Sequence, residues 1–310
     1  MSLRPGPPDI APVRAFLQSL QTGLVQGLEA IDGAAKFVGK ELGLPGGGVS
    51  RPRVLQGGER LEKAAVQFTH SVGASLPPAA TERNPHLAGR PFQAVAVSVI
   101  VHPRNPYAPT AHMNLRFFLV DTRDASTGGS HWHFGGGFDL TPCYPLLADV
   151  RHWHRVARDA AGEHYEAMKQ ACDEYFYLPH RGETRGVGGL FFDDWREGGF
   201  EASFALAKAI GNAFADAYLP ILRRRLDTPW GEREERWQLI RRGRYAEFNL
   251  ALDRGTRYGL QSGRRVESVL ASLPPRAAWV HDHRPEEGSP EATLKGFLTA
   301  RDWLGGEGPD

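Results

Sequence analysis

Hydrophobic residues recur every three or four positions in several parts of the chain, which is the spacing of an amphipathic helix. The first such segment covers residues 10–31, where Phe16, Leu20 and Leu24 share one face. The same spacing predicts helices at about residues 146–160, 163–177, 200–223, 231–242 and 290–303, with a short helix near 265–272. The pattern therefore places most of the helices in the second half of the chain.

Other segments alternate hydrophobic and polar residues, or concentrate β-branched and aromatic residues, as β-strands do. Residues 92–101 and 113–120 are two such runs, joined by a proline-containing loop, and are predicted to be neighbouring strands. Further strands are predicted at about residues 132–140, 190–194, 244–253 and 277–281. The glycine-rich residues 46–58 lack the ending of a phosphate-binding loop and are interpreted as a mobile loop. Because helices do not alternate regularly with the strands, an antiparallel or mixed sheet flanked by helices is favoured over a doubly wound fold.

Three of the predicted strands carry polar side chains on one face only, since successive residues of a strand point to opposite faces. On the first two strands this polar face gathers Ser98, His102, His112, Asn114 and Arg116. On the third it gathers His131, His133, Gly135, Gly137 and Asp139. A solvated sheet face is the commoner cause of such alternation, but it favours Lys, Glu and Thr, which are absent here. The glycines indicate that a broad ligand approaches the backbone, with a β-bulge as the alternative.

Composition excludes several classes of function. The net charge is +1, so no overall field attracts nucleic acid or an anionic membrane. The longest apolar run, residues 92–101, is half as long as a membrane span requires, and the N-terminal residues contain no apolar signal core. Cys143 and Cys172 are too few and too far apart for a disulfide framework or a zinc cluster. A soluble protein in a reducing, cytoplasmic setting is therefore expected.

Two histidines of the helix at residues 146–160 are predicted to point in different directions. His154 shares a helical stripe with Val150 and Trp153 and should point inwards, whereas His152 lies among charged residues and should be solvated. An inward-pointing histidine is more often a hydrogen-bonded core residue than a metal ligand. His180, in a loop after the next helix, is ambiguous in the same way.

Longer motifs follow one another along the chain: SVIVHP at residues 98–103, AHMNLRFF at 111–118, FGGGFDLTP at 134–142, the stretch 173–194, and RRGRYAEFNL at 241–250. Together they resemble signatures of the oxygen-dependent (aerobic) coproporphyrinogen III oxidases, and the resemblance runs from about residue 10 to Trp303. It implies an α+β fold in which a large, mainly antiparallel sheet is flanked by helices on both faces, as a single domain over residues 1–310. It also implies a homodimer with residues 245–253 at or near the subunit contact.

The resemblance assigns roles by position. His112 looks like the general acid–base, and Asp139 resembles the carboxylate placed over the pyrrole nitrogens. The positions similar to substrate contacts are Ser98, Asn114, Leu115, Arg116, Gly263, Arg264 and Arg265. The positions similar to divalent-metal ligands are His102, His112, His154 and His180. The implied cofactor is a divalent cation, with Mn²⁺ favoured, and no flavin, haem or nicotinamide is expected.

The chain departs from the family pattern in two places. A substrate motif that usually reads Gly-Gly-Arg is Gly263-Arg264-Arg265 here. The glycine run, usually preceded by paired tryptophans, follows His131-Trp132-His133. The two extra histidines lie beside the polar face, so the set of metal ligands stays open.

The activity that the resemblance implies is the oxidative decarboxylation of two propionate groups of coproporphyrinogen III to vinyl groups. Dioxygen is the oxidant, and the product is protoporphyrinogen IX. Asp139 would hold or remove a pyrrole proton, while Arg116 and Arg265 would hold propionates by charge-assisted hydrogen bonds.

Two other classes stay open. A non-catalytic tetrapyrrole-binding carrier would keep the arginines but need neither Asp139 nor oxygen. A histidine-ligated iron oxygenase acting on another substrate should bring two histidines and one carboxylate together. The spacing of the histidines along the chain does not match that second pattern closely.

Overall fold

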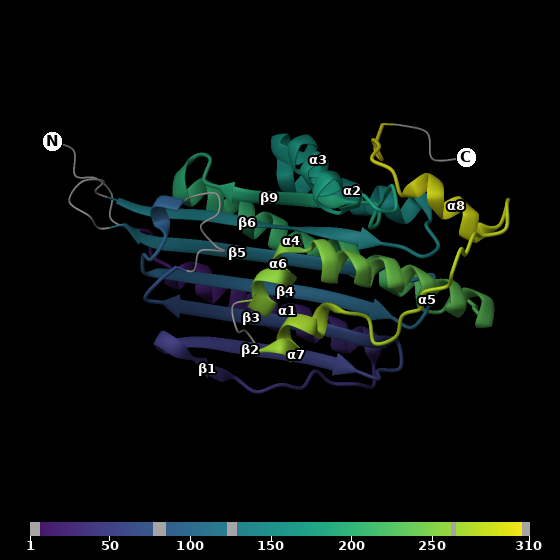
Figure 1. The fold of residues 1–310 in the computed structure, drawn as a ribbon, viewed down its shortest axis with the longest axis horizontal. Coiled ribbons are helices and arrows are strands. Elements are labelled where there is room, and N and C mark those ends of the chain that lie inside the picture. The colour runs from purple at the N-terminus through teal and green to yellow at the C-terminus, as the bar shows by residue number, and fades with distance from the viewer. Residues whose placement is uncertain (1–6, 77–84, 123–128, 262–264, 306–310) are drawn as a thin grey trace.

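Seven strands form one antiparallel sheet in the computed structural model, which describes residues 7–76, 85–122, 129–261 and 265–305 (Figure 1). Their order across the sheet is β1 (Leu42–Leu44), β2 (Gly48–Gln56), β3 (Leu61–Gly73), β4 (Phe92–Pro103), β5 (Thr110–Thr122), β6 (Gly129–Thr141) and β9 (Gly189–Trp195). A separate short ribbon joins β7 (Tyr177–Leu178) and β8 (Glu183–Thr184). The predicted α+β fold with a mainly antiparallel sheet is confirmed.

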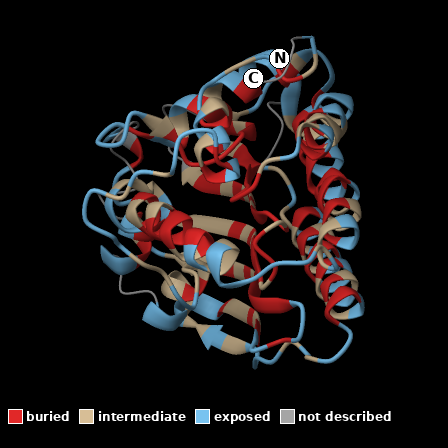
Figure 2. Cartoon of the chain, turned by 90° about the vertical axis from the view of Figure 1, so that its right-hand side faces the viewer, coloured by how far each residue is buried: buried red, intermediate tan, exposed pale blue. Residues whose placement is uncertain are grey.

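Helices lie on both faces of this sheet, as predicted (Figure 2). They are α1 (Ala11–Asp32), α2 (Leu147–Ala161), α3 (Tyr165–Tyr175), α4 (Gly199–Arg225), α5 (Glu232–Glu247), α6 (Arg254–Gln261), α7 (Val266–Val269) and α8 (Pro290–Phe297). Helices α1, α2 and α4 share one hydrophobic core with the sheet. The opposite face meets the segment around α7, where Lys63 and Gln67 of β3 donate hydrogen bonds to the carbonyls of Leu273 and Ser268.

Residues with even numbers on β4 and β5 point away from α1 and α4, towards the second helical layer, which is the one that contains α7. This is the orientation that the alternation of polar and apolar residues predicted. Ser98 lies opposite Asn114, and Asn114 lies opposite Gly137 of β6. His112 lies opposite Asp139. The three strands therefore bring their polar residues to one shared face, which we call the polar face.

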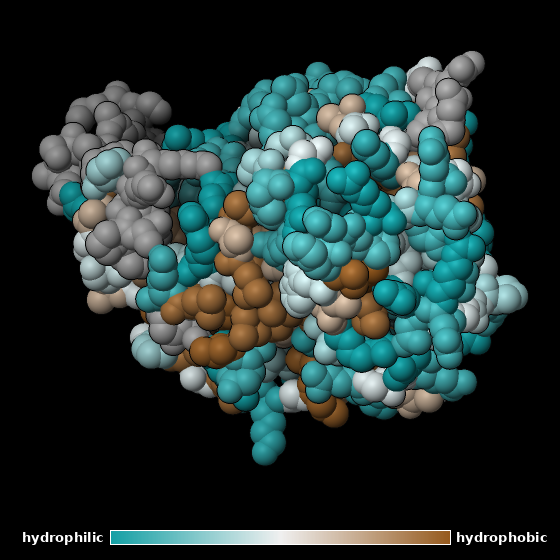
Figure 3. Space-filling model, turned by 45° about the vertical axis from the view of Figure 1, so that its right-hand side comes forward, coloured by the Kyte–Doolittle hydropathy of each residue, from teal (hydrophilic) through white to brown (hydrophobic). Residues whose placement is uncertain are grey.

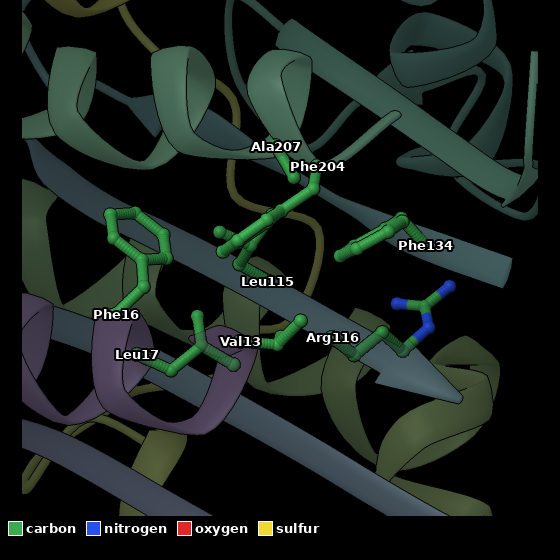
Figure 4. A pocket seen from close by; sticks show the side chains of 8 residues that line it. All are labelled: Val13, Phe16, Leu17, Leu115, Arg116, Phe134, Phe204 and Ala207. Atoms are coloured by element: carbon green, nitrogen blue, oxygen red, sulfur yellow. The ribbon is translucent and has the colours of Figure 1, made fainter. Parts of the chain in front are cut away.

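The apolar face of the same strands is closed by helices α1 and α4. Val95, Val97, Met113 and Phe117 are fully buried there. A small crevice remains between the two helices (Figure 4). It is lined by Val13, Phe16 and Leu17 of α1, Phe204 and Ala207 of α4, Leu115 and Arg116 of β5, and Phe134 of β6. Because nearly all of its lining is apolar, this crevice offers no chemistry, and the polar face is the place to look for a site.

Three sequence predictions about elements are wrong. Residues 244–253 are helical rather than a strand: α5 runs to Glu247 and continues as a π-helical turn over Phe248–Leu252. Residues 277–281 form no strand, and Ala278 instead donates a backbone hydrogen bond to Leu239 of α5. Residues 46–58, interpreted as a loop, contain strand β2. Helix α8 also ends at Phe297, earlier than the predicted residue 303.

These corrections have physical reasons. The buried residues at the end of α5 are Tyr245, Ala246, Phe248 and Asn249, which follow helical spacing, whereas Leu250 is 48% exposed. The apparent alternation over 246–252 was therefore coincidental. The glycines of residues 46–58 lie at the two ends of β2 and mark its turns rather than a continuous loop.

Candidate active site

A His–Asp–Arg cluster lies at the centre of the polar face. The Nδ1 of His112 donates to Oδ1 of Asp139 across the β5–β6 pair at 3.0 Å. Arg185, from the loop between β8 and β9, donates to the same carboxylate twice, from Nη2 to Oδ1 at 2.7 Å and from Nε to Oδ2 at 3.1 Å. This two-point contact fixes the carboxylate in one orientation.

The cluster is held in a low-dielectric environment. Asp139 and Arg185 have side chains only 2% exposed. The guanidinium of Arg185 also donates to Oδ1 of Asn249 and lies over three aromatic rings, those of Phe176, Tyr245 and Phe248. Such burial is tolerated because each charge is paired and hydrogen-bonded.

Burial alone would raise the pKa of Asp139, since it disfavours the charged form. The charge of Arg185 and the hydrogen bond from His112 outweigh it, so the pKa of Asp139 lies below its usual value. The same pair changes the pKa of Arg185. Burial lowers this pKa, but the carboxylate of Asp139 raises it by more, so the net shift is upwards. Asp139 is therefore an ionised carboxylate at neutral pH.

His112 is the member of the cluster that reaches solvent, with a side chain 22% exposed. An ionised carboxylate only accepts hydrogen bonds, so the Nδ1 of His112 carries the proton and, in the neutral ring, Nε2 is the acceptor. The ring is further positioned by an edge-on contact with Phe176. His112 can thus take up or release a proton at Nε2 while Asp139 holds its orientation.

A second charged group lies four residues further along β5 from His112. Arg116 donates to Oδ1 of Asp193 on β9 at 2.6 Å and to Oδ1 of Asn114 at 3.0 Å. Arg254 of α6 donates to the other oxygen of Asp193 at 3.3 Å. The guanidinium of Arg116 lies across Gly135, where an added Cβ would be 2.8 Å from Nη2. This arrangement is a ready-made site for a carboxylate, which Asp193 now fills.

A bulge, the alternative interpretation of the glycine run, is present at this place, but it lies in β9 opposite the glycines of β6. Phe134 pairs with Trp195 and Gly136 with Phe192, so β9 places Asp193 and Asp194 where β6 has one residue. Gly137 has a φ of +139°, and a Cβ there would lie 1.9 Å from the carbonyl oxygen of Leu190. The glycines thus serve strand pairing as well as the close approach of Arg116.

The remaining predicted substrate contacts fall in different places. Ser98 is half-buried on the polar face beside Asn114. Leu115 points the other way and is buried in the apolar core. Arg265 is exposed and pairs with Glu267 at 3.0 Å. Gly263 and Arg264 lie outside the described residues, so nothing is said of their placement.

The four histidines predicted as metal ligands do not come together within the described chain. His102 is buried and contacts Thr110 Oγ1 and the Ser272 carbonyl. His154 is buried as predicted, and its two ring nitrogens contact Tyr165 Oη and the Val187 carbonyl. His180 pairs with Glu247 at 3.0 Å. With two of the four rings engaged at both nitrogens, the set does not fit a shared ion in this structure, and bound metal stays a prediction.

The prediction that His154 points inwards and His152 is solvated is confirmed in part. His154 is fully buried, and burial holds its pKa at about 3 despite the hydrogen bond to the Val187 carbonyl. His152 is half-buried rather than fully solvated, and its Nε2 contacts the carbonyl of Asp216 on α4 at 3.1 Å.

Arg185, Asn249 and Asp193 are site residues that sequence reasoning missed. Arg185 lies in a loop without periodicity, and Asn249 was assigned to a strand that does not exist. Asp193 was counted only as part of a short strand. The available signal was an arginine and two adjacent aspartates within the motif-bearing stretch 173–194.

An antiparallel sheet that holds a buried, ion-paired carboxylate beside a partly exposed histidine and an arginine has the organisation of an enzyme active site. Comparison with known families gives the particular one: the model of the Coproporphyrinogen III oxidase family matches residues 12–303. The chain therefore belongs to this family, is an oxidoreductase, and has a role in haem biosynthesis. Membership implies coproporphyrinogen III as the substrate. Within the described residues, none of the helices has the length and apolar character to cross a membrane.

Proposed function

We propose that this protein uses dioxygen to convert two propionate groups of coproporphyrinogen III into vinyl groups, giving protoporphyrinogen IX. The observation that carries the proposal is the His112–Asp139–Arg185 cluster beside the carboxylate site at Arg116, both on one sheet face. A reduced tetrapyrrole with acidic side chains needs both a proton-handling group and carboxylate anchors.

The electron balance sets what the residues must do. Each propionate loses carbon dioxide and two hydrogens, one from the β-carbon and one from the carboxyl group, and a vinyl group remains. The two electrons and two protons pass to one dioxygen, which becomes hydrogen peroxide. The electron-rich tetrapyrrole is itself the reductant, so the protein's part is to bind, orient, exclude water and move protons.

His112 is proposed to move the proton, because its side chain is 22% exposed and its Nδ1 bonds to Asp139, which leaves Nε2 for the proton transfer. Asp139 acts through this hydrogen bond and through its fixed negative charge, which favours positive charge on a neighbouring imidazole or pyrrole N–H. Its low pKa makes it a weak base, so holding the proton donor is favoured over removing the proton.

Arg116 is proposed to bind a substrate propionate in place of Asp193. Both are carboxylates, so the exchange keeps the same charge-assisted contact. Arg265 lies at the exposed start of α7 and would bind a further propionate at the rim of the site. Because the four histidines do not converge, no step of this mechanism is routed through a metal ion.

A homodimer in a cytoplasmic setting is also proposed. Leu250, Leu260 and Val266 are large hydrophobic side chains that are 44–52% exposed. Figure 3 shows a hydrophobic patch on the side of the molecule that carries the C-terminal helices. Exposed apolar patches of this kind mark association surfaces. Both cysteines are buried free thiols, which fits a reducing compartment.

The proposal is tested by mixing the protein with coproporphyrinogen III in air-saturated and in oxygen-free buffer. Oxygen consumption, released carbon dioxide and vinyl products are measured together. We expect one oxygen consumed for each carbon dioxide released, and no product without oxygen. A carrier would bind the tetrapyrrole with no oxygen consumption in either buffer, and that result would overturn the proposal.

A further inference from the structure

Three metal-ligating side chains meet where β6 and β9 pair irregularly, apart from the His112 cluster. His133, Asp193 and Asp194 each offer one ligand atom, and these atoms lie within 4.8 Å of one another. Among the described residues, this is the one group of histidine, cysteine or carboxylate side chains that comes so close. The Nε2 of His133 is 3.6 Å from Oδ1 of Asp194.

The backbone brings both carboxylates to the same point. In a regular strand Asp193 and Asp194 would point to opposite faces. Here β9 has these two residues opposite the single Gly135 of β6, and Asp194 has a φ of +52°. A left-handed residue in a bulge re-aims its side chain, and such strain persists only where the surroundings hold it.

His133 is suited to be a ligand. Its ring stacks on Phe118, which fixes its plane, and its buried Nδ1 finds no hydrogen-bond partner among the described residues. An imidazole whose plane is fixed in this way can present a ring nitrogen to a metal ion.

We propose that His133, Asp193 and Asp194 form a binding site for a divalent first-row transition cation. One imidazole nitrogen and two carboxylate oxygens are ligands that Zn²⁺, Co²⁺ and Mn²⁺ accept. Ligand atoms about 2.1 Å from such an ion lie about 3–4 Å from one another. Small side-chain rotations therefore close the present spacing.

The rival interpretation is a plain ion-pair network. Asp193 already accepts hydrogen bonds from Arg116 and Arg254, which offset its charge. That network does not explain why the left-handed φ of Asp194 brings a second carboxylate to the same point as Asp193. A cation held by both carboxylates and by the Nε2 of His133 accounts for this convergence.

One consequence rests on the proposed function. An ion that takes an oxygen of Asp193 weakens its contact with Arg116, and the guanidinium becomes available to a substrate propionate. The metal would then favour substrate binding without touching the His112 cluster. The binding test below uses no substrate, so it stands or fails independently of the proposed reaction.

The test is binding of Zn²⁺ alone to chelator-treated full-length protein at pH 7.5, measured by equilibrium dialysis and metal analysis. His133→Phe keeps a flat ring on Phe118 but removes the ligand, and Asp194→Asn keeps a side chain that tolerates the left-handed backbone. We expect each to weaken binding at least about 10-fold. His152→Phe, the same substitution on the surface of α2, should leave it unchanged. Melting curves confirm that each variant is folded.

His112→Ala separates this site from one at the polar-face histidines. Unchanged Zn²⁺ binding in His112→Ala, together with the losses in His133→Phe and Asp194→Asn, supports the proposal. Wild-type affinity in His133→Phe, loss of the ion in His112→Ala, or no bound Zn²⁺ in the wild type would each overturn it.

Discussion

The Asp139–Arg185 pair is the most demanding contact at the residue scale, because both charges are almost completely buried. Removing one partner leaves the other charge unpaired in a low dielectric, which costs about 3–5 kcal/mol. Arg185→Met should therefore lower the free energy of unfolding by about this amount. Adding Asp139→Asn removes the unpaired charge, so the double variant should recover much of the loss. Urea unfolding of the wild type, both single variants and the double variant measures this coupling.

A loss in the double variant equal to the sum of the two single losses would contradict it, because the two residues would then contribute independently. The comparison needs no substrate. It tests the electrostatic description of the cluster apart from its catalytic role.

Site residues on strands were predictable from the sequence, because the alternation of polar and apolar residues shows which side chains share a face. The polar faces of two strands gave Asn114 and Arg116, and the register opposite β6 then placed Asp139 against His112. Arg185 could not be found in this way, since a loop has no periodicity that relates its side chains to a strand. Its position depends on how the β7–β8 ribbon folds against the sheet.

At the scale of elements, the glycines of β6 divide between folding and binding. Gly137→Ala places a Cβ against the Leu190 carbonyl at a φ that L-residues avoid, so it should destabilise the protein strongly. Gly135→Ala meets only the flexible end of Arg116, so it should fold nearly normally but displace the guanidinium and raise KM. Melting temperature and KM for this matched pair give the readout. The reverse assignment, with Gly135→Ala unfolding and Gly137→Ala normal, would refute it.

Glu247, the last residue of α5, ties three segments together. It accepts hydrogen bonds from Arg181 of the turn between β7 and β8 and from Trp279, and it pairs with His180. Burial opposes its ionisation, but the hydrogen bonds with Arg181 and His180 and the charge of Arg244 outweigh burial and lower its pKa from 4.5 to about 2. The contribution of ionised Glu247 to the free energy of unfolding is therefore present above pH 4.5 and is lost as the pH falls towards about 2.

Glu247→Gln should lower the free energy of unfolding by about 1.5–3 kcal/mol at pH 5, and the gap from the wild type should narrow at pH 3. Urea unfolding at the two values measures it. Glu41→Gln, whose carboxylate is 60% exposed, is the control and should change stability by less than about 0.5 kcal/mol. A gap that widens at pH 3 would contradict the ionised form as the stabilising one.

Among the elements, the strands with one buried face were predictable and the end of α5 was not. Alternation over β4, β5 and β6 follows from burial against α1 and α4. Residues 246–252 alternate by coincidence, because the helix widens into a π-helical turn that keeps Phe248 buried and exposes Leu250. The local sequence pattern does not distinguish a true strand from this helical segment. The helical form is stabilised by the tertiary contacts of Tyr245 and Phe248 with Arg185, which a local pattern does not contain.

For the whole molecule, the exposed apolar side chains near the C-terminal helices predict self-association. Light scattering at low micromolar concentration should give twice the 34.1 kDa of a single chain. Leu250→Asp places a charge in the 48% exposed position and should shift the equilibrium towards the monomer. Trp230→Asp, at a similarly exposed apolar residue before α5, is the control and should stay dimeric. A wild type that gives only the 34.1 kDa species would contradict the homodimer.

The whole molecule can be described as one sheet with two unlike faces. The apolar face is closed by α1 and α4, while the polar face presents His112, Asp139 and Arg116 beneath the second helical layer. We propose that this polar face carries out the decarboxylation and that Asp139 is required to hold His112. Stability alone does not test that claim, since a buried carboxylate also serves folding.

The most direct measurement is the kcat of Asp139→Asn with coproporphyrinogen III under air, with Asp159→Asn as the control at an exposed carboxylate of α2. Asparagine keeps the size and polarity of Asp139 but lacks its charge, so the Nδ1–H of His112 loses the charged acceptor that orients the imidazole. We expect a protein that is less stable but folded and still binds substrate, while kcat falls at least about 100-fold and Asp159→Asn is unchanged. Turnover of Asp139→Asn within a few-fold of the wild type would contradict it.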